Sequence, residues 1–519
     1  MRKIAWILCF ALVLSLFAGC SDEKEAYVPT GDALDDATMA TQAPPPGQLE
    51  AEGNAYTLGY FAKDGFNPYD VTGYTNRHLF SLLYQGLFSV DGDYNVEPML
   101  CKTYTMSEDM KTYTFRLEPA IFSDGTYIDA EDVVASLETA EDSDFYEGRF
   151  RFIGDIEALN ETTVKISLLT PMENLPILLD IPIVKAENVG DMMPSGTGPY
   201  RLVRTVSGLT LQRKANWWCT TENLAVTAQA IVLRSAESPA KIRDWFEFED
   251  VGIAYADPGS GTYAEYRCDY EVWDCETGIM TFLACHEESK VFSNPQVRAA
   301  LTYAINREVL VESNYNGFAQ AATLPASPNS PYYDKTLAAQ VTYNPERLIQ
   351  ALTESNLTGE TVILLLNKSD STRLQTGYQI AEMLTQCGLV VEIQEMSTNM
   401  FRNSVYAGNY DLYLGQTQLS ANMDLSEFFH PYGYISWGSM SNEDLYALCL
   451  NALENSGNYY NLHQMVVQDG MLTPVLFRTY AVYMERGLMG GLNPARDNVY
   501  WYSIGKNMED AMTIVVDEE

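Results

Sequence analysis

The clearest alternation of apolar and polar segments lies between residues 361 and 429. The apolar run 362–366 is too short for a helix and is bounded by turn residues, so it predicts a buried strand. Residues 389–395 and 410–415 predict a second and a third strand. In the two stretches between these strands, apolar residues recur at helical spacing. Because crossovers of this length return the chain in the same direction, the pattern predicts a parallel sheet.

The two connecting stretches carry the marks of helices. The first places Ile380, Met383 and Leu384 on one face and ends at Gly388, a residue suited to the left-handed position after a helix. The second is shorter, and Asn399 is its predicted cap. We therefore expect helices to cover this sheet.

Open parallel sheets bind ligands outside the carboxyl ends of their strands, so the segment after Leu414 is expected to line a pocket. Residues 415–424 are polar and uncharged until Asp424, with no pairing of a nucleophile with a base and no metal cluster. We predict that this segment holds a solute, with Gln416, Gln418 and Asp424 as candidate contacts.

A second candidate ligand loop lies near the start of the folded part. Residues 56–61 alternate like a strand and residues 76–84 predict a helix. Between them, the loop 71–76 offers Tyr74 and Asn76 as its best hydrogen-bonding groups. We predict that both contact the solute.

Residues 84–193 are predicted to form a lobe of their own. Residues 112–117 alternate as a strand, and Asp129 can cap a helix whose acidic first turn suits the positive end of the helix dipole. Residues 91–95 start like a calcium loop but lack its later glycine and glutamate, so they predict a hairpin turn.

The first twenty residues have the layout of a secretion signal: a basic start, an apolar run shorter than a bilayer span, and a small pair before Cys20. Residues 16–20 resemble the bacterial lipoprotein box, which implies cleavage before Cys20 and acylation of that cysteine. Residues 21–53 are acidic and rich in small residues, which predicts a solvated tether.

The length of the chain indicates how many lobes to expect, and its charge argues against some functions. A chain of 519 residues exceeds what one hydrophobic core supports, so two or three lobes are expected. A formal charge of −38 repels phosphate backbones and argues against nucleic-acid binding. No cofactor is predicted, and the motifs of serine hydrolases, zinc proteases and phosphate-binding loops are absent from the sequence. We therefore predict no catalytic residues.

The cysteines indicate neither a disulfide framework nor a metal site. Cys9 lies in the signal and Cys20 is the predicted site of acylation, which leaves an odd number of other cysteines. Cys268 and Cys275 could bridge a short loop, and Cys285 could add a metal ligand. Their spacing matches no zinc pattern, so buried thiols are expected and no metal is predicted.

A series of short motifs occurs along the chain. They include Asn67-Pro68 and residues 83–87, 97–100, 112–117, 122–126, 130–134, 194–200, 216–218 and 297–308. In their order they resemble the family 5 extracellular solute-binding proteins of ABC importers, the group that includes dipeptide, oligopeptide and nickel binders, and the resemblance covers nearly all of the mature chain. Within these motifs, we interpret the glycines of 194–200 as residues that allow a turn of the backbone, not as ligand contacts. We interpret Arg298 and Arg307 as solvated or ion-paired.

The resemblance implies an α/β, two-lobed fold like that of periplasmic binding proteins (class II, cluster C type) with an extra inserted subdomain. Residues 271–283 and 472–483 would be the two connectors between lobes, and two connectors make a hinge with a cleft that can shut. The implied parts are a signal (1–19), a lipidated tether (20–54), domain Ia (55–83, 194–272 and 474–519), subdomain Ib (84–193) and domain II (273–473).

The chain departs from the peptide-binding members at one place. After the third strand, those members resemble one another in a glycine-tryptophan pair and an aspartate that holds the ligand's amino terminus, and these positions are Gln416, Thr417 and Ser420 here. A buried ammonium without a carboxylate partner is unfavourable, so Asp424 would have to replace it. Trp437 is a further candidate contact, and it would equally suit a sugar.

The resemblance implies a lipid-anchored, extracytoplasmic component of an ABC importer. As a monomer, it would capture a small solute, above all a peptide, and deliver it to a permease of the cell membrane. Two alternatives remain open: a non-peptide solute such as an oligosaccharide, and a surface sensor or adhesin that does not transport. Nickel is not favoured, because the four histidines are scattered.

Overall fold

The structure is a computed structural model. It describes residues 55–71, 73–205, 208–219, 228–257, 266–436, 439–486 and 494–495. The signal, the tether, Cys20 and Trp437 lie outside the described residues.

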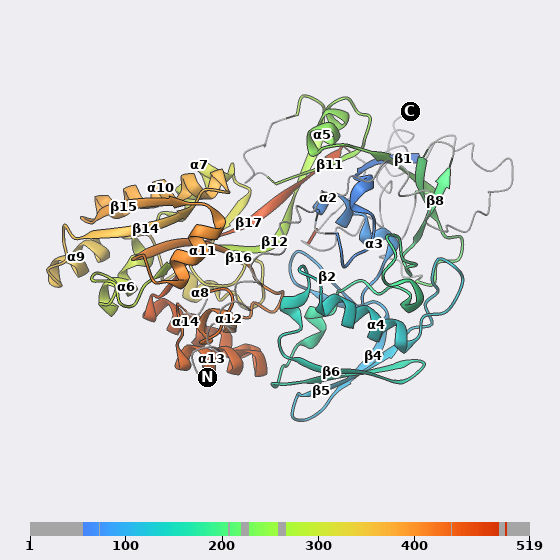
Figure 1. Cartoon of the computed structure of the whole chain (residues 1–519), viewed down its shortest axis with the longest axis horizontal. Helices are drawn as coiled ribbons and strands as arrows, with labels where there is room; N and C mark the ends of the chain where they lie inside the picture. Colours follow the sequence, from blue (N-terminus) through green and yellow to red (C-terminus); the bar gives the residue numbers. More distant parts are fainter. Residues whose placement is uncertain are drawn as a thin grey trace, which may run out of the picture. The chain divides into compact units, whose positions relative to one another are not determined.

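Two long antiparallel strands, β12 (Tyr270–Cys285) and β17 (Leu472–Glu485), run through the middle of a seven-stranded sheet (Figure 1). Both segments predicted as connectors lie in these strands. From Cys275 onward, every residue of β12 is buried, including Glu276. The other strands are β11 (Ile253–Ala256), β13 (Ala319–Ala321), β14 (Thr361–Asn367), β15 (Val390–Met396) and β16 (Leu412–Gln418).

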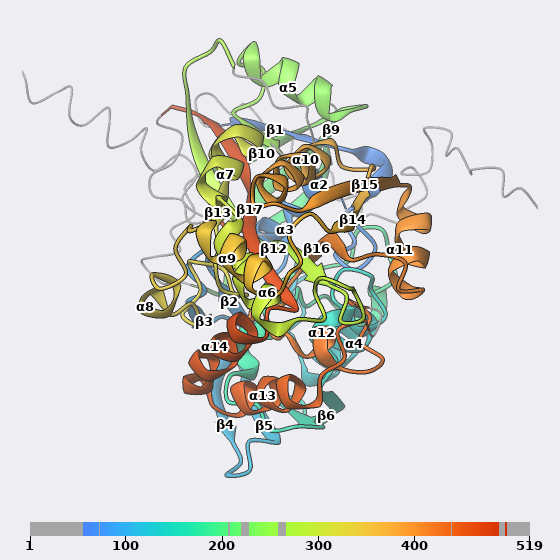
Figure 2. The same ribbon diagram turned by 90° about the vertical axis from the view of Figure 1, so that its left-hand side faces the viewer.

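The predicted parallel unit is confirmed. β14 pairs in parallel with β15 on one side and with β16 on the other. Because the chain moves outward from β14 to β15 and back to β16, right-handed crossovers place α10 (Ser371–Gln386) and α11 (Thr398–Tyr406) on opposite faces, as Figure 2 shows. Gly388 has a φ of 100°, as expected after a helix end.

Two details of this unit differ from the prediction. The third strand does not end at Gly415 but continues to Gln418, because residues 415–418 pair with β12 across from Phe282 to Ile279. The cap position of α11 is held by Ser397 and not by Asn399. Both differences come from pairing partners and turn geometry that a local pattern does not show.

The N-terminal part is built on a four-stranded sheet in the order β1 (Ala55–Tyr60), β10 (Ala230–Ser235), β9 (Gly208–Arg213) and β8 (Tyr200–Thr205). The single helix predicted over residues 76–84 is wrong. Two short helices, α2 (Tyr74–Arg77) and α3 (Phe80–Leu83), replace it. The N–H of Leu79 donates to the carbonyl of Asn76, three residues back, and this tighter turn interrupts the α-helical ladder.

Residues 84–193 contain a separate antiparallel sheet. Its order is β4 (Cys101–Met106), β5 (Thr112–Leu117), β7 (Thr163–Leu168) and β6 (Ile153–Asn160). Asp129 caps α4 (Ala130–Glu141) in a reciprocal capping box with Asp132, which confirms the predicted start. The hairpin β2 (Phe88–Val90) and β3 (Val96–Pro98) confirms the predicted turn, whose backbone N–H groups donate to the Asp91 carboxylate.

The interpretation of Arg307 was wrong. This side chain is buried, and its guanidinium donates to the carbonyls of Thr302, Ala322 and Pro474. Arg298 does lie near a carboxylate, that of Asp469, at 3.9 Å. Remaining helices are α5 (Pro239–Glu247), α6 (Pro295–Leu301), α7 (Arg307–Tyr315), α8 (Lys335–Ala338), α9 (Glu346–Glu354), α12 (Ser426–Phe429), α13 (Glu443–Glu454) and α14 (Tyr459–Asp469).

Two structural absences concern the described residues. Neither Cys268 nor Cys275 is joined in a disulfide there. No helix in the described ranges has the length and apolar character needed to cross a bilayer.

Candidate functional site

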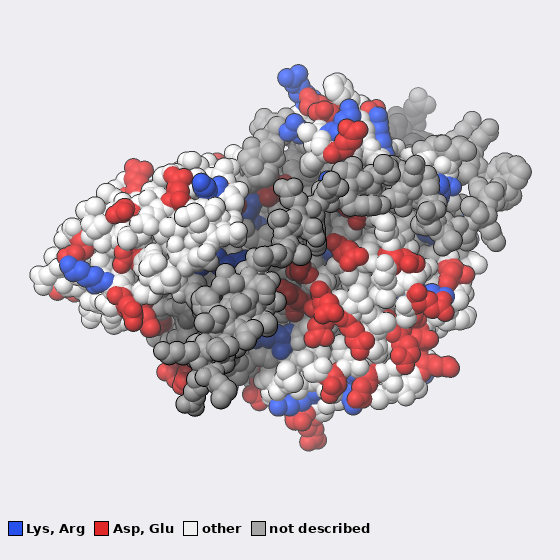
Figure 3. Space-filling model, in the orientation of Figure 1, with Lys and Arg blue, Asp and Glu red and all other residues white. Residues whose placement is uncertain are grey.

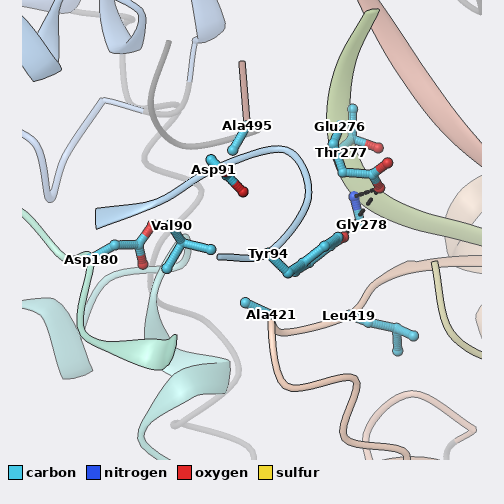
Figure 4. A pocket seen from close by; sticks show the side chains of 10 residues that line it. All are labelled: Val90, Asp91, Tyr94, Asp180, Glu276, Thr277, Gly278, Leu419, Ala421 and Ala495. Carbon is cyan, nitrogen blue, oxygen red and sulfur yellow. Dashed lines mark hydrogen bonds between the residues drawn. The ribbon is translucent and has the colours of Figure 1, made fainter. Parts of the chain in front are cut away.

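A cavity lies where the β2–β3 hairpin approaches β12 and the segment after β16. It encloses about 320 Å³ that no atom fills, part of it open to solvent. Figure 4 shows side chains from these separate segments around it. The lining residues are Val90, Asp91, Tyr94, Asp180, Glu276, Thr277, Gly278, Leu419, Ala421 and Ala495.

Glu276 connects the segments that meet at this cavity. Its Oε1 accepts hydrogen bonds from the Tyr94 hydroxyl and the Gly278 N–H, each at 3.2 Å, and its Oε2 accepts one from Asn329 at 3.3 Å. The pairing of β12 with β17 shifts register between Glu276 and Ile279, and Gly278 takes a φ of 67°. This bulge turns the carboxylate toward the hairpin.

Acidic side chains surround the site. Asp91, Asp180 and Glu276 all line the cavity, and no Lys or Arg is among its described lining residues. Asp180 forms a buried ion pair with Arg149, which offsets its charge. Figure 3 shows further Asp and Glu side chains on the surface over α4. The field around the cavity therefore favours neutral or cationic groups.

Two predicted contacts lie near the N-terminal part of the site. Tyr74 packs within an aromatic group, with its ring centroid 6.3 Å from that of Tyr255 and 4.6 Å from that of Tyr480. Asn76 is fully buried, and its amide bonds the backbone of Phe61 and Gly65. In this conformation Asn76 shapes the loop, and its amide is already engaged.

The segment after β16 does reach the cavity, through residues that the sequence did not single out. Gln416 accepts a hydrogen bond from Arg478 at 3.0 Å, and Gln418 donates to the carbonyl of Thr277 at 2.9 Å. Leu419 and Ala421 line the cavity in their place. The two predicted glutamines are held by neighbouring strands because β16 is longer than expected.

Asp424 ends this segment and is engaged locally. Its carboxylate accepts hydrogen bonds from the backbone N–H and the hydroxyl of Ser426, at 2.8 and 2.6 Å. Burial raises the pKa of this carboxyl group, although the Ser426 bonds oppose the rise. Asp424 therefore organises the start of α12 in this conformation.

Arg478 is the functional candidate that sequence reasoning missed. Its guanidinium donates to the Asp257 carboxylate at 2.8 and 3.0 Å, to Asp370 at 2.9 Å and to Gln416. Burial alone would lower its pKa, but the Asp257 and Asp370 carboxylates outweigh burial and raise it. The signal was present in the sequence: one charged residue inside the apolar strand β17.

The described residues contain no group of three or more His, Cys, Asp and Glu side chains arranged to hold a metal ion. Beside its carboxylates, the cavity offers hydrogen-bonding groups and apolar surfaces. Such a set can hold a solute between segments that come from distant parts of the chain.

Comparisons with known proteins agree with this arrangement. Residues 95–439 match the model of the middle part of the bacterial extracellular solute-binding proteins, family 5. The glutathione-binding protein GsiB of Escherichia coli is 27% identical over 347 residues, which cover 64% of this chain and 67% of that protein. GsiB of Pectobacterium atrosepticum is 27% identical over 349 residues, covering 64% and 66%.

Solved structures share the fold. HbpA2 from Haemophilus parasuis has a TM-score of 0.74 at 17% identity, covering 87% of this chain and 99% of that one. The oligopeptide-binding protein AppA from Bacillus subtilis, solved with a nonapeptide, has a TM-score of 0.60 at 18% identity, covering 86% and 97%. The fold is thus the mixed α/β, two-lobed type of these binding proteins. With two thirds of its length matched by the family model, the chain belongs to the bacterial extracellular solute-binding proteins of family 5.

Proposed function

We propose that this protein captures a peptide in the cleft between its two lobes and delivers it to the permease of an ABC importer. The observation that carries the proposal is the cavity at β12, which is lined from the predicted subdomain Ib, from the connector and from domain II. A solute bound there contacts all three only when the lobes have met. Binding therefore shifts the population towards the shut state.

Membership of the family supports the importer role. The printed names of the similar proteins refer to glutathione and to a nonapeptide, both of which are peptides. Gln416, Thr417 and Ser420 replace the residues that peptide-binding members use for the amino terminus, so the contacts to a peptide must differ here. An oligosaccharide is the alternative solute, because aromatic rings gather at Tyr74, which stacks on Tyr255 and meets Tyr480 edge to face.

The experiment is native mass spectrometry of the full chain in detergent, before and after mild unfolding. We expect a released peptide mass and a rise in melting temperature when a random peptide pool is added. Release of a sugar, or stabilisation by sugars alone, would replace the peptide proposal with its alternative. Incubation with the released solute is expected to leave it intact, because binding requires no bond to break.

The proposed location is the outer face of the cytoplasmic membrane, with the acyl group on Cys20 as the anchor and the monomer as the working state. Replacing Cys20 with Ala is expected to abolish incorporation of labelled fatty acid and to release the protein from the membrane fraction. Full membrane retention of this variant would contradict the anchor.

A further inference from the structure

An ion pair joins the predicted subdomain Ib to the predicted domain II. Its members are Arg151, which lies between the 3-10 helix η2 (Glu147–Arg149) and β6, and Glu427 on α12. Neither is among the residues that line the cavity. The two side chains are only 18% and 13% exposed, so salt screens this pair less than it screens two charges in open solvent.

The carboxylate of Glu427 is held in place by its own part of the chain. Its Oε2 accepts a hydrogen bond from the Tyr434 N–H at 2.6 Å, and its Oε1 faces Arg151. The next residue, Phe428, is fully buried, and its ring meets that of Phe282 on β12 edge to face, with centroids 5.1 Å apart. The acceptor is thus fixed to the central sheet independently of subdomain Ib.

Arg151 is likewise held by its own part of the chain. Two positions earlier, Arg149 forms a buried ion pair with Asp180, which ties this segment to subdomain Ib. The guanidinium carbon of Arg151 lies 5.2 Å from the centre of the Phe152 ring, and Phe152 is itself buried. The segment therefore presents the Arg151 cation to domain II from a fixed position.

The place that Arg151 enters on domain II is acidic and closely packed. Asp424 lies nearby: burial raises the pKa of its carboxyl group, and the positive charge of Arg151 is among the influences that oppose the rise. A Cβ placed on Gly148 of subdomain Ib would lie 3.1 Å from the Tyr434 hydroxyl. The two parts therefore fit together around this ion pair.

Separation of the two parts changes the free energy of both charges. With the parts apart, water solvates Arg151 and Glu427. With the parts together, each charge has lost most of its water and depends on the other. A shielded charge without its partner is unfavourable, so removal of either one penalises the shut form and leaves the open form unaffected. The pair therefore acts on closing and not on the folding of either part.

We propose that Arg151 and Glu427 form a charged latch through which subdomain Ib closes on domain II and slows release of the solute. The inference rests on the closing motion of the proposed function, and it holds whether or not the solute is a peptide. Because the latch is electrostatic, it makes solute retention depend on ionic strength even when the solute carries no net charge. It gives subdomain Ib a part in binding beyond the residues that line the cavity.

The test reverses the two charges singly and together in the full chain in detergent, with the tripeptide Ala-Phe-Ala as the probe. By isothermal titration calorimetry, Arg151→Glu and Glu427→Arg should each weaken binding about tenfold, because each places two like charges in the latch. The double variant restores an ion pair and should bind within about threefold of the unaltered protein. The control Lys165→Glu reverses a charge whose partner, Glu157, lies on the neighbouring strand of the same sheet, and it should bind normally.

Salt and stability separate a latch from a contact that only supports the fold. Without solute, all the variants should melt near the temperature of the unaltered protein. A rise from about 50 mM to about 500 mM NaCl should weaken binding of Ala-Phe-Ala about threefold in the unaltered protein, and hardly at all in the variant Arg151→Gln with Glu427→Gln. Single variants that bind normally, or a double charge reversal as weak as both single variants combined, would overturn the latch.

Failure of the peptide proposal gives a different result. If Ala-Phe-Ala does not bind the unaltered protein, the peptide is wrong, and hydrogen exchange of the protein as purified tests the latch by itself. The amides of residues 147–152 and of α12 should exchange faster in Arg151→Glu and return to the unaltered rate in the double charge reversal. Equal exchange in all three proteins would refute the latch.

Discussion

At the scale of single residues, this fold depends on buried polar side chains whose partners are mostly backbone groups. Arg307 donates to four backbone carbonyls, those of Thr302, Ile305, Ala322 and, on β17, Pro474. Asn76 holds the loop after β1 in the same manner. These bonds satisfy carbonyl groups that would otherwise be buried without a donor.

His463 on α14 makes the stability of the fold depend on pH. It is fully buried, and both ring nitrogens lack a hydrogen-bond partner among the described residues. Burial lowers its pKa from 6.5 to about 3, so the folded protein holds a neutral imidazole. The unfolded chain takes up a proton below pH 6.5. The fold therefore loses stability as the pH falls from 6.5 towards 3.

The expected loss from this histidine is about 2 kcal/mol at pH 5 relative to pH 7. The free energy of unfolding in urea, measured at both pH values, should fall less in His463→Leu than in the unaltered protein by about that amount. The variant His286→Gln, which alters a partly exposed histidine, serves as the control. Equal pH dependence in all three proteins would refute the assignment.

At the scale of elements, glycines determine how closely segments can approach. A Cβ on Gly198 would lie 2.5 Å from the carbonyl carbon of Leu83, and one on Gly196 would lie 2.2 Å from the oxygen of that carbonyl. The turn before β8 therefore packs its backbone directly on the end of α3. Only glycine permits this approach.

The Gly198→Ala variant is expected to lose about 3 kcal/mol or more of unfolding free energy, because backbone atoms cannot move aside. The matched control is Gly190→Ala, since a Cβ on this exposed glycine would meet nothing within 4 Å. Urea unfolding should show the control within about 0.5 kcal/mol of the unaltered protein. A tolerated Gly198→Ala would mean that the turn and α3 are further apart.

At the scale of the whole molecule, the predicted subdomain Ib contacts the predicted domain II away from the cavity. The Glu173 carboxylate accepts from the Ser456 N–H at 2.7 Å, and the Glu173 N–H donates to the Leu453 carbonyl at 2.8 Å. Asn174 donates to the Tyr332 hydroxyl at 3.3 Å. If the lobes move apart on solute release, these bonds exist only in the shut state.

Removing the carboxylate in Glu173→Ala is therefore expected to weaken solute binding about three- to tenfold, although Glu173 does not line the cavity. Calorimetric affinity for the solute identified by mass spectrometry is the measurement, and the melting temperature without solute should hardly change. The control Glu138→Ala alters an exposed acid on α4. Unchanged affinity in Glu173→Ala would show that this contact does not respond to solute.

The sequence by itself determined the elements with strong local signals. The strand at 362–366, the helix that ends before Gly388 and the capping box at Asp129 follow from periodicity and terminal residues, which act within a few positions. The glycines of the turn at 194–200 could also be interpreted correctly. Local patterns suffice for such features because their energetics are local.

Only the tertiary structure decided where the polar side chains of the site find partners. Gln416 and Gln418 lie after a buried strand, as expected, yet Arg478 and Thr277 from distant strands engage them. Arg307 likewise finds an acceptor, the carbonyl of Pro474, on a strand far away in the chain. Long-range pairing sets burial and charge, and these quantities separate a residue that holds the fold from one available to a solute.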